Sequence, residues 1–207
     1  MSERLTVILD RHGAVNNPDG VLYFRNLEVE LSPEGHSQMQ RLGDLLKKRG
    51  INPVAIYTST HSRAVESAKE IAKSFPEVPI VRSKELQDVD APALSSKTVA
   101  WVITKRLLGK DVFSESENKG EMESRKAVAE RMLRFLKQLS EKHSGRTVVV
   151  ISHADPIFYL RYRLKHPHKP LPTRIGILTL LRYPKIGQAI RIVLDKNFEL
   201  VEETKIN

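Results

Sequence analysis

Residues 7–13 read VILDRHG, a run of aliphatic side chains that stops at an aspartate and is followed by Arg11, His12 and Gly13. The aliphatic stretch 5–9 is typical of a strand buried on both faces, since such a strand carries apolar side chains at successive positions. A turn that happens to contain arginine and histidine is one interpretation of the polar residues. A binding site for an anion is the other, and the rest of the sequence decides between them.

Further apolar strands alternate with amphipathic helices along the chain. After the first strand at 5–9, strands are expected at 54–58, 78–81, 147–152, 175–182 and 189–194, and helices at 32–50, 63–75, 97–108, 121–142 and 155–164. Such alternation predicts an α/β fold, a three-layer helix–sheet–helix sandwich with a mainly parallel central sheet.

Several helix starts are marked by residues that can cap a first turn. Ser32 followed by Pro33 is a strong start for the first helix, because a serine side chain accepts a backbone N–H and proline has no N–H to leave unpaired. Ser59 or Thr60 is the expected cap of the second helix. Asp155 is the expected cap of the last helix.

Polar residues follow three of the expected strands. The first strand leads into Arg11 and His12, the second into Ser59 with Arg63 shortly after, and the strand at 147–152 into His153. Because the carboxyl ends of parallel strands meet at one edge of a sheet, we expect these side chains to converge there. Guanidinium groups match phosphate oxygens bidentately, and an imidazole can bind a phosphoryl group or attack it. The sequence therefore favours a phosphoryl site over a chance turn.

The chain carries a formal net charge of +9, which suits anionic partners. Basic and acidic residues alternate on most of the expected helices, which argues against a nucleic-acid surface. The basic cluster 159–174 is either a lining of the site mouth or a solvated helix end. There is no cysteine, so disulfides and thiolate chemistry are excluded, and the apolar runs are too short for a membrane span. Since the N-terminus has no secretory pattern, we expect a cytoplasmic location.

Four blocks of the chain resemble a known family in order and spacing. They are RHG at 11–13, LSPEGHSQMQRLGDLL at 31–46, IYTSTHSRAVESAKEIA at 56–72 and VVVISHADP at 148–156. Together they are similar to the histidine phosphatase superfamily, which includes the phosphoglycerate mutases and many small phosphatases. The tripeptide alone is a weak signal, whereas its combination with the later arginine and histidine blocks is specific. The resemblance implies a phosphoglycerate mutase-like fold.

The resemblance also implies a role for each matching residue. His12 would be the nucleophile that carries the phosphoryl group, and His153 would act beside it as a second catalytic residue. Arg11 and Arg63, with His153, would hold the phosphoryl oxygens and stabilise charge in the transition state.

The family uses a carboxylic acid after the third strand to protonate the leaving oxygen. The segment KELQDVDAP at 84–92 occupies that place, and its Leu-Gln-Asp matches the family's usual Leu-x-Glu at Asp88. Asp88 is therefore the first candidate for the general acid. Glu85 and Asp90 are the alternatives.

The loop after RHG departs from the family pattern. The family usually carries Glu or Gln and then Thr or Ser, where this chain has Ala14 and Val15. An asparagine usually follows a few positions later, and Asn16 or Asn17 would take that place as a phosphate-binding residue. The contacts on the leaving-group side of the site are therefore the least defined by sequence.

From this resemblance we expect a single domain over 1–207 that hydrolyses phosphomonoesters of small metabolites through a phosphohistidine, without a metal ion or other cofactor. Residues 83–120 are expected to form an irregular, cap-like insertion over the site. One alternative is a cofactor-dependent phosphoglycerate mutase, but the modest length of 83–120 favours the phosphatase, since a mutase must exclude water. A non-catalytic module that binds phosphate-bearing ligands or nucleic acid is the second alternative. No membrane partner is expected, and the choice between monomer and homodimer stays open.

Overall fold

The computed structural model describes residues 4–172, 184–187 and 189–206. Its strands are β1 (Leu5–Arg11), β2 (Ile56–Thr58), β3 (Ile80–Arg82), β4 (Thr147–Ser152), β5 (Ile190–Leu194) and β6 (Leu200–Lys205). Its helices are α1 (Pro33–Lys48), α2 (Ser62–Ala72), α3 (Val99–Leu107), α4 (Val112–Asn118), α5 (Arg125–Lys142) and α6 (Ala154–Lys165), with a short 3-10 helix at Lys84–Leu86. The strand expected at 175–182 lies outside the described residues.

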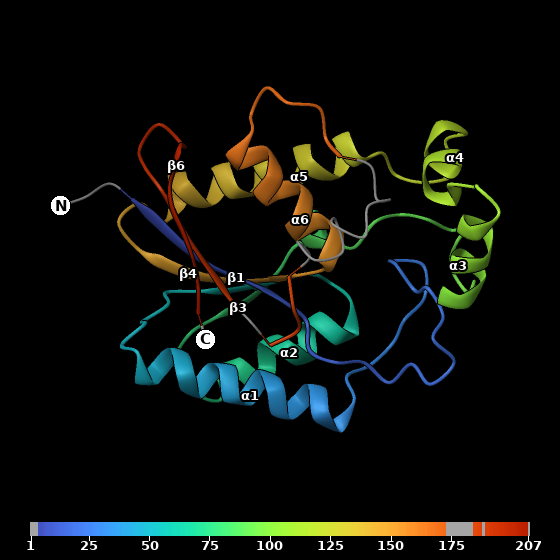
Figure 1. The fold of residues 1–207 in the computed structure, drawn as a ribbon. Coiled ribbons are helices and arrows are strands. Elements are labelled where there is room, and N and C mark those ends of the chain that lie inside the picture. The colour runs from blue at the N-terminus through green and yellow to red at the C-terminus, as the bar shows by residue number, and fades with distance from the viewer. Residues whose placement is uncertain (1–3, 173–183, 188, 207) are drawn as a thin grey trace.

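These strands form one sheet in the order β3-β2-β4-β1-β5-β6. β3, β2, β4 and β1 run parallel to their neighbours, while β5 and β6 continue the sheet in antiparallel pairing. Helices lie on both faces, α1 and α2 on one and α5 and α6 on the other (Figure 1). The expected α/β sandwich with a mainly parallel sheet is confirmed.

Both faces of the central strands are buried, which explains their unbroken apolar sequences. Val7 and Leu9 of β1 pack in a cluster with residues of α5 and α6, whereas Ile8 between them packs in a second cluster with residues of α1 and α2. Side chains of β4 alternate in the same way, with Val150 on the first side and Ile151 on the second. Successive strand residues point to opposite faces, so a two-sided core requires apolar residues at every position.

Two of the three expected helix caps are wrong. Ser32 does cap α1, and its side chain accepts the Gly35 N–H at 3.1 Å. The cap position of α2 is instead taken by His61. The cap position of α6 is taken by His153, so that Asp155 already lies inside the helix. Neither histidine caps with its side chain. The reason lies in the site, where both rings make other contacts.

Two elements were not expected from the sequence. α4 is short and polar, and its start depends on Asp111, whose side chain accepts the N–H groups of Phe113 and Ser114. β6 has two apolar residues followed by mostly charged ones, and it pairs with β5 at the edge of the sheet. Its Glu203 pairs with Arg161 and Lys165 of α6, so these two charges of the basic cluster serve packing between α6 and the sheet.

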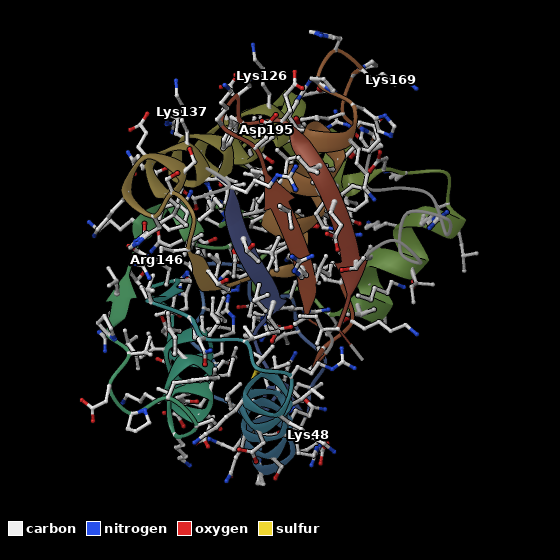
Figure 2. The ribbon with its side chains drawn as sticks, turned by 90° about the vertical axis from the view of Figure 1, so that its left-hand side faces the viewer. Lys48, Lys126, Lys137, Arg146, Lys169 and Asp195 are labelled. Carbon is white, nitrogen blue, oxygen red and sulfur yellow. The ribbon has the colours of Figure 1, made fainter. Side chains whose placement is uncertain are left out.

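Basic side chains are spread over the molecule. Exposed Lys48 lies at the end of α1, while exposed Lys126 and Lys137 lie on α5 across the sheet, and Lys169 follows α6 (Figure 2). This spread agrees with the alternation of charges seen in the sequence. Among the described residues, no helix combines the length and the apolar character that crossing a membrane requires.

Candidate active site

The register of β1 and β4 brings two histidines together. The strands are parallel, with Arg11 opposite Ser152, so the next residues, His12 and His153, leave the sheet side by side. The His12 N–H donates to the Ser152 carbonyl at 3.1 Å, and the two imidazole centroids are 5.1 Å apart. Both side chains are buried. Residues 141 positions apart in sequence thus share one site because of backbone pairing alone.

His12 is held with one particular nitrogen available. Its Nδ1 lies 2.8 Å from the Gly13 carbonyl oxygen, which can only accept, so Nδ1 carries the proton and Nε2 keeps its lone pair. Burial lowers the pKa of His12 well below its usual value, and the positive charges of Arg63 and Arg11 lower it further. The ring is therefore neutral near pH 7, as a nucleophile requires.

Arg63 projects from the first turn of α2 and is fully buried. Its Nη2 donates to the Phe24 carbonyl at 2.5 Å, and its guanidinium lies over the Tyr23 ring at 4.7 Å from the centroid. Its Nη1 is also buried and finds no hydrogen-bond acceptor among the described residues. A buried guanidinium donor without an acceptor is costly, which indicates that a ligand completes it.

His153 is oriented by two neighbours. The Arg63 Nε–H donates to its Nδ1 at 3.3 Å, so the proton of the neutral ring sits on Nε2, which donates to the Ser59 hydroxyl at 2.9 Å. Burial lowers the pKa of His153 well below its usual value, followed by the charge of Arg63. Ser59 thus orients the second histidine rather than capping α2.

Asp88 lies beside the histidines. Its Oδ2 is 3.4 Å from Nη2 of Arg63 and 3.7 Å from Nδ1 of His153. Its backbone carbonyl accepts from Arg131 of α5 at 3.1 Å, and its Oδ1 accepts from the Val89 N–H at 2.9 Å. The carboxyl group is therefore fixed at the edge of the buried site.

The other two carboxyl candidates are engaged elsewhere. Glu85 pairs with Arg134 on the outer side of α5, at 3.5 Å. Asp90 accepts from the Asn26 side chain at 2.8 Å and is nearly half exposed. Of the three acids that the sequence left open, the structure brings only Asp88 to the histidines.

A cavity of about 500 Å³ opens beside these groups. Its lining residues are Arg11, Asn17, Val21, Leu22, Tyr23, Phe24, Asp88, Val99, Phe113, Ala154 and Asp155. The Nε of Arg11 is buried without an acceptor among the described residues, as is Nη1 of Arg63. Arg11 and Arg63 thus each have a hydrogen-bond donor that a ligand could satisfy.

The two asparagine candidates are placed differently. Asn17 lines the cavity, but its amide is bonded to the backbone of Val21, donating at 2.9 Å and accepting at 3.2 Å. Asn16 is exposed, and its backbone N–H donates to the Glu30 carbonyl. Asn17 therefore shapes the cavity wall, and the structure does not bring Asn16 to the cavity.

The loop after RHG is shaped by packing against α1. A Cβ added to Gly13 would lie 2.7 Å from the Gly35 carbonyl oxygen, so a larger residue would push the loop off the helix. Val15 forms an isolated β-bridge with Leu31. Ala14 and Val15, where the family pattern is missing, are not among the cavity-lining residues.

His61 is a third buried histidine that sequence reasoning missed. It is 4% exposed, its Nδ1 lies 3.0 Å from Oε1 of Glu28, and its ring centroid is 5.3 Å from that of His153. Its Nε2 is buried without a partner among the described residues. Burial lowers its pKa, against the opposing effect of Glu28. Its position two residues before Arg63 is the sequence feature that could have pointed to it.

The chain is similar to known proteins in sequence and in fold. The family model of the histidine phosphatase superfamily (branch 1) matches residues 7–182. The chain is 28% identical to a 2,3-bisphosphoglycerate-dependent phosphoglycerate mutase of Clavibacter sepedonicus, over 80% of this chain and 77% of that protein. It is also 28% identical to a metal-independent phosphoserine phosphatase of Arabidopsis thaliana, over 77% of this chain and 69% of that protein. A phosphoglycerate mutase structure from Bacillus anthracis superposes with a TM-score of 0.76 at 18% identity, covering 98% of this chain and 93% of that one.

Proposed function

The chain belongs to the histidine phosphatase superfamily and is an enzyme of the phosphatase/mutase type, and on that premise we propose that it hydrolyses phosphomonoesters through a phosphohistidine at His12. We call Arg11, His12, Arg63 and His153 the phosphate clamp. One observation carries the proposal. Beside the neutral ring of His12, Arg11 and Arg63 each have a buried guanidinium donor that finds no acceptor among the described residues. A phosphoryl group would satisfy both donors.

In the first step, Nε2 of His12 attacks phosphorus, and the bond from phosphorus to the ester oxygen breaks. Asp88, when protonated, gives its proton to that oxygen, so the alcohol leaves neutral. Arg11, Arg63 and His153 balance the charge on the equatorial oxygens. In the second step, Asp88 takes a proton from a water molecule that attacks the phosphohistidine, the phosphorus–nitrogen bond breaks, and phosphate is released. No metal ion takes part in this scheme.

Hydrolysis rather than mutase activity is supported by the segment 83–120. Val99 of α3 and Phe113 of α4 line the cavity, which supports the proposal that the segment is a cap-like insertion within one domain over 1–207. α3 buries none of its residues and lies at one side of the molecule (Figure 1). Because α3 buries none of its residues, this side of the cavity leaves water a path to the phosphohistidine, whereas a mutase has to keep water out. Small phosphorylated metabolites are the proposed substrates, and the cytoplasmic location stays a prediction.

The direct test is His12→Ala, assayed with phenyl phosphate in the presence of a chelator. Removing the nucleophile should lower kcat by about a thousandfold or more. His168→Ala, which removes an exposed histidine, is the matched control and should leave the rate unchanged. Labelled phosphate trapped on the wild type should be acid-labile, base-stable and absent from His12→Ala.

Three outcomes would contradict the proposal. Activity of His12→Ala within tenfold of the wild type would exclude the phosphohistidine, and activity that requires added metal would exclude the scheme. Tight phosphate binding without turnover would favour a binding module. With 3-phosphoglycerate and its bisphosphate, release of free phosphate supports the phosphatase, while transfer to the 2-position supports the mutase.

A further inference from the structure

The cavity beside the phosphate clamp has two kinds of lining residue. Its polar lining residues are Arg11, Asn17, Tyr23, Asp88 and Asp155. Its apolar lining residues from the loop before α1 and from the first residues of α3 and α4 are what we call the apolar wall: Val21, Leu22, Phe24, Val99 and Phe113. A phosphate held by the clamp would direct the rest of its ester toward this wall.

Phe24 connects the apolar wall to the clamp. The Phe24 carbonyl accepts the Arg63 donor, while the Phe24 ring lies edge-to-face on Phe113 at 6.5 Å. Phe24 adopts a φ of 39°, a left-handed conformation that costs energy for a bulky residue. The fold maintains this strained residue where its backbone carbonyl positions Arg63 and its ring packs on Phe113, another residue of the cavity lining.

Charge on the lining residues also limits what the cavity can accept. Arg11 is the one cation among the described lining residues, and the clamp uses it for the phosphoryl group. The other charged lining residues, Asp88 and Asp155, are acids. Among the described lining residues, a second anionic group on the substrate, such as the carboxylate of a phosphoglycerate, would find no further cation, only the neutral polar groups of Asn17 and Tyr23 beside carboxyl groups and apolar side chains.

We propose that the preferred substrates are monophosphate esters of uncharged, apolar or aromatic alcohols, selected by the apolar wall. The inference rests on the proposed hydrolase function and names its substrate class. A ring-sized apolar group seated on such a wall should gain about tenfold to a hundredfold in kcat/KM over a group that leaves the wall empty. A carboxylate on that apolar group should lower kcat/KM by at least the same factor relative to the uncharged ester.

The test compares benzyl phosphate with 4-carboxybenzyl phosphate and with ethyl phosphate. The methylene of the benzyl esters insulates the leaving oxygen, so the two rings differ in charge and hardly in leaving-group reactivity. We expect kcat/KM for benzyl phosphate to exceed that of the carboxylated ester about thirtyfold and that of ethyl phosphate about tenfold. Equal values within threefold, or a preference for the carboxylated ester, would overturn the proposal.

Val99→Lys adds a cation to the wall at a half-exposed first helical position, where the fold should tolerate it. The variant should lower the ratio of kcat/KM for benzyl phosphate to kcat/KM for 4-carboxybenzyl phosphate at least tenfold. Ile103→Lys, one turn further along α3 and similarly exposed, does not touch the cavity and is the control. An equal shift in both variants would contradict a role of the wall.

Benzylphosphonate and its 4-carboxy analogue separate this inference from the hydrolase proposal. Their carbon–phosphorus bond is not hydrolysed, so the same preference is measured as a ratio of Kd values by calorimetry. Tighter binding of benzylphosphonate without turnover of any ester would support the wall and refute the hydrolase. Turnover of all three esters at equal kcat/KM would refute only the wall.

Discussion

The phosphate clamp and the apolar wall lie side by side, yet the fold positions them by different means. His12 and His153 sit at the ends of paired strands and are at most 1% exposed, so backbone hydrogen bonds fix them. Val99 and Phe113 sit on helices of the insertion, and Val99 is 49% exposed. Rigid sheet edges suit chemistry common to all substrates, while loops and short helices can vary with the alcohol. Changes in the clamp should therefore affect every ester alike, and changes in the wall should alter selection.

Asp88→Asn should have the largest effect among the changes that keep the nucleophile. Without a proton donor, kcat/KM for phenyl phosphate should fall about a hundredfold, within the usual range for a general acid. 4-Nitrophenyl phosphate has a similar ring but a more acidic leaving group, so its loss should be about tenfold or less. Steady-state kinetics on the two esters measures the difference.

Asp90→Asn is the matched control for this prediction, because Asp90 bonds to Asn26 rather than to the site. It should leave both rates within about threefold of the wild type. A similar loss on both esters in Asp88→Asn would show that Asp88 positions the clamp and does not donate the proton.

His61→Leu should have an intermediate effect and tests how rigid the clamp must be. The His61 ring packs edge-on against His153 and is tied to Glu28. Its loss should let His153 shift and lower kcat/KM about tenfold, equally for benzyl and ethyl phosphate, since small displacements of clamp residues are costly. His36→Leu removes a histidine of a comparable His–Glu pair away from the site and should be neutral. An effect of His61→Leu on one ester alone would place His61 with the wall.

Asp10→Asn should have the smallest effect on activity and tests the stability cost of burying the strand that carries the clamp. Asp10 is fully buried, its carboxyl oxygens find no hydrogen-bond donor among the described residues, and burial raises its pKa to about 8 against the opposing effect of Arg11. From about pH 4 to pH 8 the unfolded chain has lost a proton that the native state keeps, so this group lowers stability as pH rises. Relative to wild type, Asp10→Asn should gain up to about 1.4 kcal/mol per pH unit across that window.

Urea unfolding at pH 5 and pH 8 measures this gain, and kcat/KM for benzyl phosphate should stay within about twofold. The same difference in unfolding free energy at both pH values would show that Asp10 is ionised in the native state. A large loss of activity would place Asp10 within the clamp.

The parts of the site that the sequence revealed are those carried by strand ends. An apolar run that ends in a polar residue marks a strand end, and parallel pairing brings such ends to one edge, so His12, Arg63 and His153 could be grouped in advance. The neighbouring residue His61 was missed because its significance depends on Glu28, which lies 33 positions earlier in the chain. Ser59 was interpreted as a cap for the same reason, since its real partner is His153.

The amino-acid sequence by itself determined the α/β fold and the convergence of the histidines and arginines, because both follow from local periodicity and the geometry of a parallel sheet. Only the tertiary structure decided that Asp88, of three nearby acids, faces the histidines, and that Phe24 and Phe113 form a wall beside them. These choices depend on the path of irregular chain, on the left-handed backbone of Phe24 and on the short helix α4. Such features arise from contacts between distant segments, which no repeating pattern in the sequence encodes.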